Sequence, residues 1–503
     1  MNIVTAKEMY ELDAYTMNDC GLEGRVLMEN AGRAMANHIS SSYPTTQPML
    51  VLAGKGNNGG DGFVIARVLA QRGFQVSVLL CQSPERISGD AAYHLSLLQA
   101  LDVSIHEWES KETLIELSKG QPIFIDAMLG LGIKGEVREP YRTIITLLND
   151  WNQSILAVDV PSGLPADEGV DVDLAIKATR TYTIHFPKVS AFLQQTAPYY
   201  GERVEVDIGL FQKPDMPVRN LWGEKEVRQT LPERSPFAHK GTFGKGLVVG
   251  GSVPMPGSVA MTARAALRSG AGLLTVATTK ESIPAISPLV TEATFVPLEQ
   301  KDGFINELKD LDFDSYDGVA FGMGLGTHEE AQQLLTRALR STEGPLVIDA
   351  DGLTALVNVL HELKERSAPT ILTPHPGEMA RLLDVSVADL LKQPFRYVRQ
   401  FAVENGVSVI LKGAFTIVTD QSGQQWVTTT GNQALAKGGS GDVLTGIVLT
   451  MLMQDQPLYA ALNNACFIHG RAADLLVEEK HSHYDLLATD LIEGIGRVIR
   501  TRS

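Results

Sequence analysis

Short apolar runs recur along the chain and alternate with longer segments that have helical periodicity. In the first half, runs at residues 49–53, 122–125 and 155–158 each end at a glycine or an aspartate. Runs of this length and composition are typical of parallel strands that are covered on both faces. Further strands are expected at 76–80 and 181–186, and helices over 5–40 and 63–71. The pattern therefore predicts an α/β domain with a doubly wound parallel sheet.

The second half repeats this alternation. Residues 258–269 predict a helix with small residues on one side, and Gly270 is placed to end it. Residues 443–453 are strongly apolar and predict a buried helix. Strands are expected at 246–249, 273–277, 318–321, 346–348, 370–372, 408–411, 416–419 and 425–429. A second α/β domain follows, whose strand ends carry many glycines and ionisable groups.

Residues 211–240 separate the two halves and differ from both. Four prolines fall in this segment, with charged residues between them and few apolar runs. We expect a first domain at 1–215, a linker at 216–240 with one short helix near 224–231, and a second domain at 241–503. Each of these halves is long enough to bury its own core.

Composition narrows the class of protein. Apolar residues make up 44% of the chain and charged residues 20%, as in an ordinary globular protein. The net charge of −16 argues against nucleic acid as a partner. The three cysteines, Cys20, Cys81 and Cys466, are far apart and suggest neither a disulfide framework nor a zinc site. With no secretory signal at the start of the chain and no apolar run of membrane-spanning length, we expect a cytoplasmic protein without a membrane partner.

The sequence from Gly438 to Asp442, Gly-Gly-Ser-Gly-Asp, stands directly before the apolar helix at 443–453. Glycines at a helix N-terminus let backbone N–H groups approach an anion, and the helix dipole favours phosphate there. Asp442 would then stand beside the phosphate, where a carboxylate can accept a proton from an attacking hydroxyl. The alternative is a flexible loop in which Asp442 only caps the helix.

The segment 54–62 of the first half has five glycines, two asparagines and an aspartate in nine residues. Its spacing fits neither a P-loop nor G-x-G-x-x-G, but its composition exceeds what a turn needs, and we expect it to bind a ligand. Asp126 and Asp159 follow two strands whose carboxyl ends would meet at the same crevice. Together with Asn58 and Asp61 they would suit a hard cation or sugar hydroxyls. Alternatively, each aspartate caps the helix that follows it.

Several single residues admit two interpretations. Lys412 ends a strand and could meet a nucleotide phosphate, or it could simply end the strand. His375 lies between two prolines, which favours a ligand contact over a structural role. Asp349 and Asp351 could cap helices or belong to a site. Lys188 could pair with a phosphate, although a surface position is favoured.

Taken together, the motifs resemble those of the bacterial bifunctional NAD(P)H-hydrate repair enzymes over nearly the whole chain. In that family an NAD(P)HX epimerase domain is joined to an ADP-dependent NAD(P)HX dehydratase domain. The first half carries MENAG (28–32), GKGNNGGDG (54–62), DAMLGLG (126–132) and DVPSG (159–163). The second half carries a helix motif at 257–276, GMGLG (322–326), DADGL (349–353), LTPHPGEMARLL (372–383), LKG (411–413) and GGSGD (438–442). The family's Asn-Pro-Gly-Met-Ala before the last motif is replaced by Asn-Gln-Ala-Leu-Ala at 432–436.

For the second domain the resemblance implies a ribokinase-like fold and a dehydratase that uses ADP and Mg²⁺. Asp442 would be the catalytic base that takes the proton of the C6 hydroxyl of the hydrated nicotinamide. Phosphorylation would then make that hydroxyl a leaving group, giving NAD(P)H, AMP and phosphate. The hydrate would contact Gly324, Gly326, His375 and Asp442. The nucleotide would contact Lys412, Gly413, Ala414, Phe415, Thr416, Gly438, Gly439, Ser440 and Gly441.

For the first domain the resemblance implies a Rossmann-like fold that interconverts the R and S epimers of NADHX and NADPHX. Asp159 would be its catalytic acid and base. K⁺ would be held by Asn58, Asp126 and Ser162. The hydrate would be bound by Asn57, Asn58, Gly59, Gly60, Asp61, Gly130, Leu131, Gly132, Ile133, Lys134, Gly135, Glu136 and Asp159.

Two other functions fit parts of the pattern. The second domain could be an ATP-dependent ribokinase-like kinase of a hydroxymethyl group on a vitamin precursor, although the PHPGE segment at 374–378 argues against it. The first domain could instead only bind nucleotide-like ligands and tether or regulate the second, although Asp126 and Asp159 argue against that. In every case small molecules are the partners, and a homo-oligomer is expected.

Overall fold

The computed structural model describes residues 1–133, 135–214, 219–308 and 311–500. The chain divides into two compact units, Met1–Pro217 and Val218–Ser503. Each unit has its own sheet and its own core. No helix among the described residues is long and apolar enough to cross a membrane.

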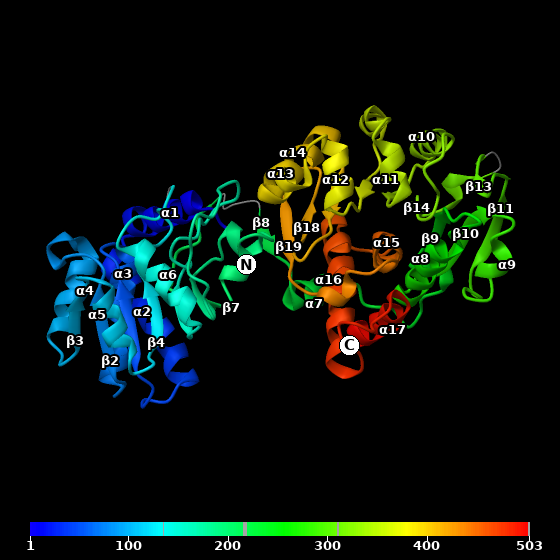
Figure 1. Ribbon diagram of the computed structural model, residues 1–503. Coiled ribbons are helices and arrows are strands. Elements are labelled where there is room, and N and C mark those ends of the chain that lie inside the picture. Colours follow the sequence, from blue (N-terminus) through cyan, green and yellow to red (C-terminus); the bar gives the residue numbers. More distant parts are fainter. Residues whose placement is uncertain (134, 215–218, 309–310, 501–503) are drawn as a thin grey trace. The chain divides into compact units, whose positions relative to one another are not determined.

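The sheet of the first unit has seven parallel strands in the order β3-β2-β1-β4-β5-β6-β7 (Figure 1). From β1 the next strands in sequence, β2 and β3, are added on one side, and from β4 the strands β5 to β7 are added on the other side. The switch point of a doubly wound sheet therefore lies between β1 and β4. The strands are β1 (Met49–Ala53), β2 (Val76–Leu80), β3 (Ser104–Glu107), β4 (Ile123–Ala127), β5 (Ile155–Val158), β6 (Arg180–Ile184) and β7 (Glu202–Val206). The helices are α1 (Ala6–Ala14), α2 (Gly24–Ser42), α3 (Asn57–Gln71), α4 (Gly89–Gln99), α5 (Lys111–Ser118) and α6 (Tyr141–Trp151).

Both faces of this sheet are buried, which explains why its strands have apolar rather than alternating sequences. On β1, Met49 and Val51 belong to a core shared with α2, α3 and α4. Leu50 and Leu52 point the other way, into a core shared with α5 and α6. The predicted fold class of the first domain is therefore confirmed.

The second unit is built on a ten-stranded sheet in the order β11-β10-β9-β14-β15-β16-β17-β18-β19-β8. Its strands, with a separate pair β12 and β13, are β8 (Arg219–Leu221), β9 (Lys245–Val249), β10 (Leu273–Thr279), β11 (Thr294–Leu298), β12 (Gln300–Lys301), β13 (Phe304–Ile305), β14 (Gly318–Phe321), β15 (Leu346–Ile348), β16 (Thr370–Leu372), β17 (Ser408–Leu411), β18 (Thr416–Thr419) and β19 (Gln425–Thr428). In this sheet β11, β10, β9, β14, β15, β16 and β17 are parallel to one another. Strand β18 is antiparallel to both β17 and β19, whereas β8 pairs with β19 in parallel.

Helices cover this sheet on both faces (Figure 1). One layer contains α8 (Pro256–Ser269), α15 (Ser440–Leu452), α16 (Leu458–Glu479) and α17 (Ala488–Arg500), which share a single core. The other layer contains α10 (Ala331–Ser341), α11 (Asp351–Leu356), α12 (Pro376–Leu383), α13 (Val387–Lys392) and α14 (Pro394–Asn405). Two short helices, α7 (Glu224–Thr230) and α9 (Ile283–Ile286), complete the unit.

The segment predicted as a linker contains β8 and the expected short helix, α7. The strand β8 pairs with β19, so residues 219–221 extend the sheet of the second unit. The predicted end of the first domain at residue 215 and the start of the linker at 216–218 lie outside the described residues.

Candidate active sites

A cavity of about 700 Å³ opens at the carboxyl ends of the strands of the first unit. Predicted substrate residues on its wall are Asn57, Asn58, Asp61, Gly130, Leu131, Gly132, Ile133 and Asp159. The cavity therefore lies at the switch point between β1 and β4, where a doubly wound sheet binds its ligands. The predicted residue Lys134 lies outside the described residues, and Gly59, Gly60, Gly135 and Glu136 do not line the cavity.

Four of the five glycines of 54–62 serve close packing, and the prediction that the helix begins at Phe63 was wrong. Helix α3 begins at Asn57, so most of the expected loop is its first turns. A Cβ atom on Gly59 would lie 2.0 Å from the carbonyl oxygen of Gly54, and one on Gly60 would lie 2.4 Å from the sulfur of Met28. The backbone of α3 thus approaches β1 and α2 more closely than any side chain would permit. This approach brings Asn58 and Asp61 to the cavity wall.

Side chains of Asn58 and Ser162 are bonded to the backbone of Leu129, and Asp126 is bonded to Ser162. The buried Asp126 accepts hydrogen bonds from the Ser162 backbone N–H at 2.8 Å and from the Ser162 hydroxyl at 2.5 Å. Ser162 Oγ accepts from the Leu129 N–H at 2.8 Å, and Asn58 Nδ2 donates to the Leu129 carbonyl at 2.9 Å. Burial raises the pKa of Asp126 to about 6, although the bonds from Ser162 act in the opposite direction.

Lys188 is fully buried and forms an ion pair with Asp159, so the favoured prediction of a surface lysine was wrong. Its Nζ also donates to the carbonyl of Ile184 at 3.2 Å. Asp159 itself has φ of 65°, a left-handed conformation that few non-glycine residues adopt. Residues 160–187 separate the two partners, so the pairing had no local signal in the sequence.

Two further groups on the cavity wall, Tyr10 and Asp13, were not identified from the sequence. Both come from α1, in a segment for which the sequence predicted only helix. Burial raises the pKa of Asp13 to about 6, with Lys188 lowering it and Asp159 raising it by charge. Burial also raises the pKa of Asp61 well above its usual range. Carboxyl groups whose pKa values are displaced in a cavity are typical of active sites.

In the second unit, the glycine motif forms the turn that starts α15. Helix α15 begins at Ser440, and Gly439 has φ of 91°, which a side chain would strain. Ser440 Oγ donates to the carbonyls of Leu435 at 2.8 Å and Lys437 at 3.0 Å, which ties the motif to the preceding turn. The buried His469 reaches the Ser440 carbonyl at 2.9 Å, and burial lowers its pKa to about 4, so the imidazole is neutral at pH 7.

Asp442 lies in the first turn of α15 with a pKa raised to about 7. Burial is the largest cause, and the negative charge of Asp349 adds to it, whereas Lys412 and a hydrogen bond from Ser258 oppose it. A carboxyl group with this pKa can accept and release a proton near pH 7, as general base catalysis requires.

Below the glycine motif the buried Asp349 forms an ion pair with the partly buried Lys412. Lys412 Nζ lies 3.0 Å from Asp349 Oδ1, and the Thr445 hydroxyl donates to Asp349 Oδ2 at 2.6 Å. The positive charge of Lys412 helps to lower the pKa of Asp349 despite its burial. A Cβ atom on Gly441 would lie 3.3 Å from Lys412 Nζ, so the lysine reaches the backbone of the motif. Asp349 therefore belongs to the site, which the sequence left open.

His375 caps α12, a structural role that the two prolines had seemed to disfavour. Its Nδ1 accepts hydrogen bonds from the N–H groups of Gly377 at 2.9 Å and Glu378 at 3.3 Å. Because Nδ1 accepts, the proton of a neutral ring is on Nε2, and 57% of the side chain is exposed. His375 can cap α12 through Nδ1 and contact a ligand through Nε2 at the same time. Its predicted contact with the hydrate therefore stays a prediction.

The remaining predicted residues lie on neighbouring loops. Gly324 and Gly326 have φ of 63° and 87°, and the Gly326 N–H donates to Asp351 at 2.8 Å. Gly413, Ala414 and Phe415 connect β17 to β18, which begins at Thr416. Among the described residues, no group of three His, Cys, Asp or Glu side chains is arranged to hold a metal ion.

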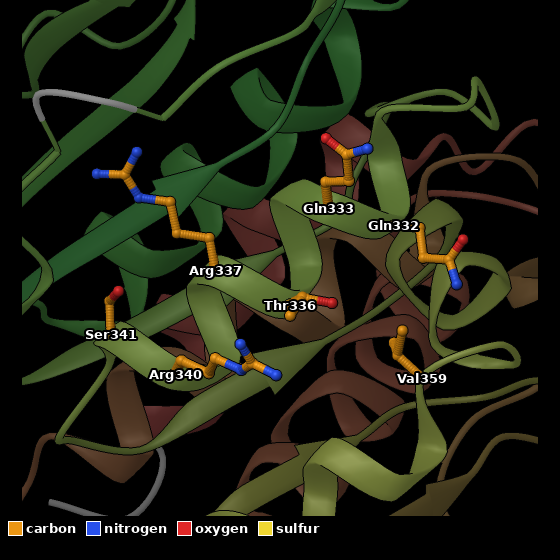
Figure 2. Close-up of a pocket in the computed structure, with 7 residues that line it drawn as sticks. All are labelled: Gln332, Gln333, Thr336, Arg337, Arg340, Ser341 and Val359. Carbon is orange, nitrogen blue, oxygen red and sulfur yellow. The ribbon is translucent and has the colours of Figure 1, made fainter.

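Another hollow, of about 480 Å³, lies along α10 and contains none of the predicted site residues (Figure 2). Six of its seven lining residues come from that helix, and the other is Val359. One of them, Arg340, is engaged by the buried carboxylate of Glu362 at 2.9 Å. The hollow is thus a surface feature separate from the site at α15.

The two halves of the chain match two different family models. Residues 24–190 match a model described as "YjeF-related protein N-terminus", and residues 246–497 match one described as "NAD(P)H-hydrate dehydratase". The bifunctional NAD(P)H-hydrate repair enzyme Nnr of Coxiella burnetii is 36% identical over 488 residues, which are 96% of each chain.

Solved structures resemble a little over half of the chain. An ADP/ATP-dependent NAD(P)H-hydrate dehydratase from Bacillus subtilis, co-crystallised with ATP and Mg²⁺, is 37% identical, with a TM-score of 0.51 over 56% of this chain and 99% of its own. A ribokinase-like superfamily protein from Enterococcus faecalis is 24% identical, with a TM-score of 0.51 over 58% of this chain and 99% of its own. The ribokinase-like fold expected for the second domain is confirmed.

Proposed function

This chain belongs to the bifunctional NAD(P)H-hydrate repair enzymes, and from this premise we propose how its two sites divide the reaction. The first unit epimerises the R and S forms of NADHX and NADPHX. The second unit dehydrates the S form to NAD(P)H and consumes ADP. The observation that carries the proposal is Asp442, a carboxyl group with a pKa of about 7 in the first turn of a helix whose glycine motif suits phosphate.

In the second unit, Asp442 takes the proton of the C6 hydroxyl, and the hydroxyl oxygen attacks the β-phosphorus of ADP while AMP leaves. Lone-pair electrons of the ring nitrogen then expel phosphate from C6, and a proton leaves C5 to restore the dihydropyridine. The N–H groups at Gly438 to Gly441 would stabilise the charge that develops on the phosphoryl group. Lys412, held by Asp349, supplies positive charge below the motif.

Mg²⁺ would reach this site bound to the phosphates of ADP. The relative from Bacillus subtilis was co-crystallised with ATP and Mg²⁺. The described residues of this chain offer no ready-made cluster of acidic side chains for a metal, which suits a cation whose other ligands are phosphate oxygens. Bound there, it would neutralise charge on the nucleotide. The predicted contacts of Gly324, Gly326 and His375 with the hydrate and of 412–416 with the nucleotide remain part of the proposal.

In the first unit, Asp159 would act as both acid and base. Removal of the C6 hydroxyl proton opens the ring, with cleavage of the bond between N1 and C6 and protonation of N1. Closure on the other face of the new carbonyl reverses these transfers, so no net proton is consumed. The cavity of about 700 Å³ is large enough to bind a substantial part of a dinucleotide.

K⁺ would be held in this unit by Asn58, Asp126 and Ser162. The fit rests on the Asp126 carboxylate, the Ser162 hydroxyl and the Leu129 carbonyl, because such oxygens are ligands of hard cations. Asn58 lies beside them, with its Nδ2 bonded to the Leu129 carbonyl. A bound K⁺ would supply a fixed positive charge at the edge of the cavity. Asp126, whose carboxylate already orients Ser162, would face that ion.

We also propose that the enzyme works in the cytoplasm as a homo-oligomer. Cytoplasmic location is supported by the three free cysteines, of which Cys81 and Cys466 are buried. The oligomeric state is open to a direct measurement by light scattering coupled to size-exclusion chromatography.

One assay tests the proposed function. Purified protein is incubated with a mixture of R and S NADHX, ADP, K⁺ and Mg²⁺, and the absorbance of the reduced ring is followed. Complete recovery of NADH is expected. Recovery that stops at the S fraction would contradict the epimerase, and the absence of ADP-dependent recovery would contradict the dehydratase. A stable phosphorylated product would instead indicate a kinase.

A further inference from the structure

The burial of Lys188 has no explanation in packing alone. Its side chain is fully buried, and a charged ammonium group in such a place is costly unless it is paired. The backbone around it is clamped by the start of the chain, because Val4 N–H donates to Pro187 O and Val189 N–H donates to Val4 O, each at 3.0 Å. The lysine is therefore held at one place beside the cavity, with its ammonium group on Asp159.

The carboxylate of Asp159 is also held in place, and both of its hydrogen bonds are made by one oxygen, Oδ1. Its Oδ1 accepts a hydrogen bond from the Ile184 N–H at 2.9 Å and forms the ion pair with Lys188. Its backbone is anchored by a bond from its N–H to the Tyr182 carbonyl at 2.8 Å. Among the described residues no donor is bonded to Oδ2, while the residue lines the cavity. One oxygen is thus fixed and the other is left for a ligand.

Building on the epimerisation proposed above, we propose that Lys188 is a positioning residue for Asp159. It fixes Oδ1, so that Oδ2 is presented to the C6 hydroxyl of the substrate as the proton acceptor. Lys188 gives up no proton itself. Asp159 accepts the hydroxyl proton through Oδ2 as the carbonyl forms and N1–C6 breaks, and it returns the proton to N1.

The charges around this pair explain why a lysine is needed. The other titratable groups that interact electrostatically with the pair come from several elements, namely Tyr10, Asp13, Asp61, His185 and Tyr200. Two of them are carboxyl groups, Asp13 and Asp61, whose pKa values burial raises and Lys188 lowers. Without the lysine, the pKa values of Asp13 and Asp61 would rise further, and these two groups would hold protons in the cavity at higher pH.

Lys188→Met tests the proposal, because methionine keeps the apolar length and removes the charge. Epimerisation is followed from purified R-NADHX without ADP, with chromatographic separation of the epimers, between pH 5 and 9. The expected result is a kcat about 100-fold lower with KM changed less than about threefold. The acid limb of the pH profile should also move to higher pH by about one unit or more. A residue with only a structural role would not move that limb.

Controls separate the possible failures. Lys177→Met, an exposed lysine of the same unit, should match the wild type. Dehydration of S-NADHX with ADP in the same samples reports whether the second unit is intact, and thermal melting reports whether the first unit is folded. A folded Lys188→Met variant with wild-type kcat and an unmoved limb would overturn the inference, as would a change confined to KM.

Lys188→Arg covers the case in which the methionine variant does not fold. Arginine keeps the charge, so the acid limb should stay in place while kcat falls by about tenfold or less. A limb that moves in this variant would contradict the inference. If the wild type itself does not epimerise R-NADHX, the proposed function fails first, and the inference falls with it.

Discussion

Both units pair an aspartate with a lysine near the carboxyl ends of parallel strands, but they use the pair differently. In the first unit the paired aspartate, Asp159, lines the cavity and is the proposed acid and base. In the second, the paired aspartate, Asp349, lies beneath the site, and its negative charge contributes to the pKa of about 7 at the unpaired Asp442. The lysine of the first unit is bonded to the reacting carboxylate itself. In the second unit Lys412 pairs with the neighbouring Asp349, and burial together with the charge of Asp349 raises the pKa of Asp442.

Glycine also has different roles in the two units. In α3, Gly59 and Gly60 have negative φ and allow the helix backbone to contact its neighbours. At the start of α15, Gly439 has φ of 91°, and a Cβ atom there would lie 2.6 Å from Cε of Met261. Glycine-rich sequences thus permit close helix packing in the first unit and a left-handed turn before a helix in the second, where we propose that phosphate binds.

The largest effect should come from Asp442→Asn, which tests whether the two sites work independently. Without its base, ADP-dependent formation of NADH should fall about 1,000-fold or more, since general base catalysis contributes 10²- to 10⁴-fold. Epimerisation of R-NADHX should stay within about twofold of the wild type. Asp455→Asn, at an exposed position near the end of the same helix, is the matched control. Loss of both activities in Asp442→Asn would contradict the separation of the sites.

Gly59→Ala should affect only the first unit. The new methyl group would meet the Gly54 carbonyl oxygen at 2.0 Å, so α3 must shift away from β1 and carry Asn58 and Asp61 with it. We expect epimerisation to fall about 100-fold and the free energy of unfolding of the first unit to fall by about 1 to 3 kcal/mol. Dehydration of S-NADHX should persist. Gly120→Ala, where a Cβ atom meets nothing within 4 Å, should leave both activities unchanged.

The pH dependence of dehydration should follow Asp442. Because its pKa is raised to about 7, the carboxylate that accepts the hydroxyl proton is lost as the pH falls through 7. At pH 6 we expect kcat/KM to be about tenfold below its plateau, which initial rates with S-NADHX and saturating ADP would measure. A flat profile between pH 6 and 8 would exclude Asp442 as the base. Epimerisation in the same samples should not share this limb.

Thr445→Val should have the smallest effect and tests the support beneath the second site. The variant removes the hydroxyl that donates to Asp349 at 2.6 Å and leaves the size of the side chain unchanged. The carboxylate of Asp349 then lacks one of its hydrogen-bond donors and is held less firmly beside Asp442, so kcat for dehydration should fall about threefold. Thr450→Val removes another buried hydroxyl from the same helix, bonded instead to Ala266, and should not change kcat. Equal losses in both variants would indicate general destabilisation of α15.

The bounds of the interior strands were predicted almost to the residue, whereas strands at the edges of the two sheets were not predicted. Strands β1, β5 and β14 match the expected ranges because both faces of an interior strand are buried and the run is apolar. The edge strands β3 and β11 were missed, since their residues are largely exposed or half-buried. Strand β8 lies in the segment predicted as a linker, where three residues carry no detectable pattern.

The sequence alone determined the fold class, the glycine motifs and the aspartates that follow strands, because each of these depends on residues close together along the chain. It also placed Asp442 in the first turn of an apolar helix. Only the tertiary structure brought Lys188 to Asp159, Asp13 to the same cavity and Asp349 below Asp442. Ion pairing and pKa displacement depend on burial and on distances between residues far apart in sequence, and the local pattern carries neither.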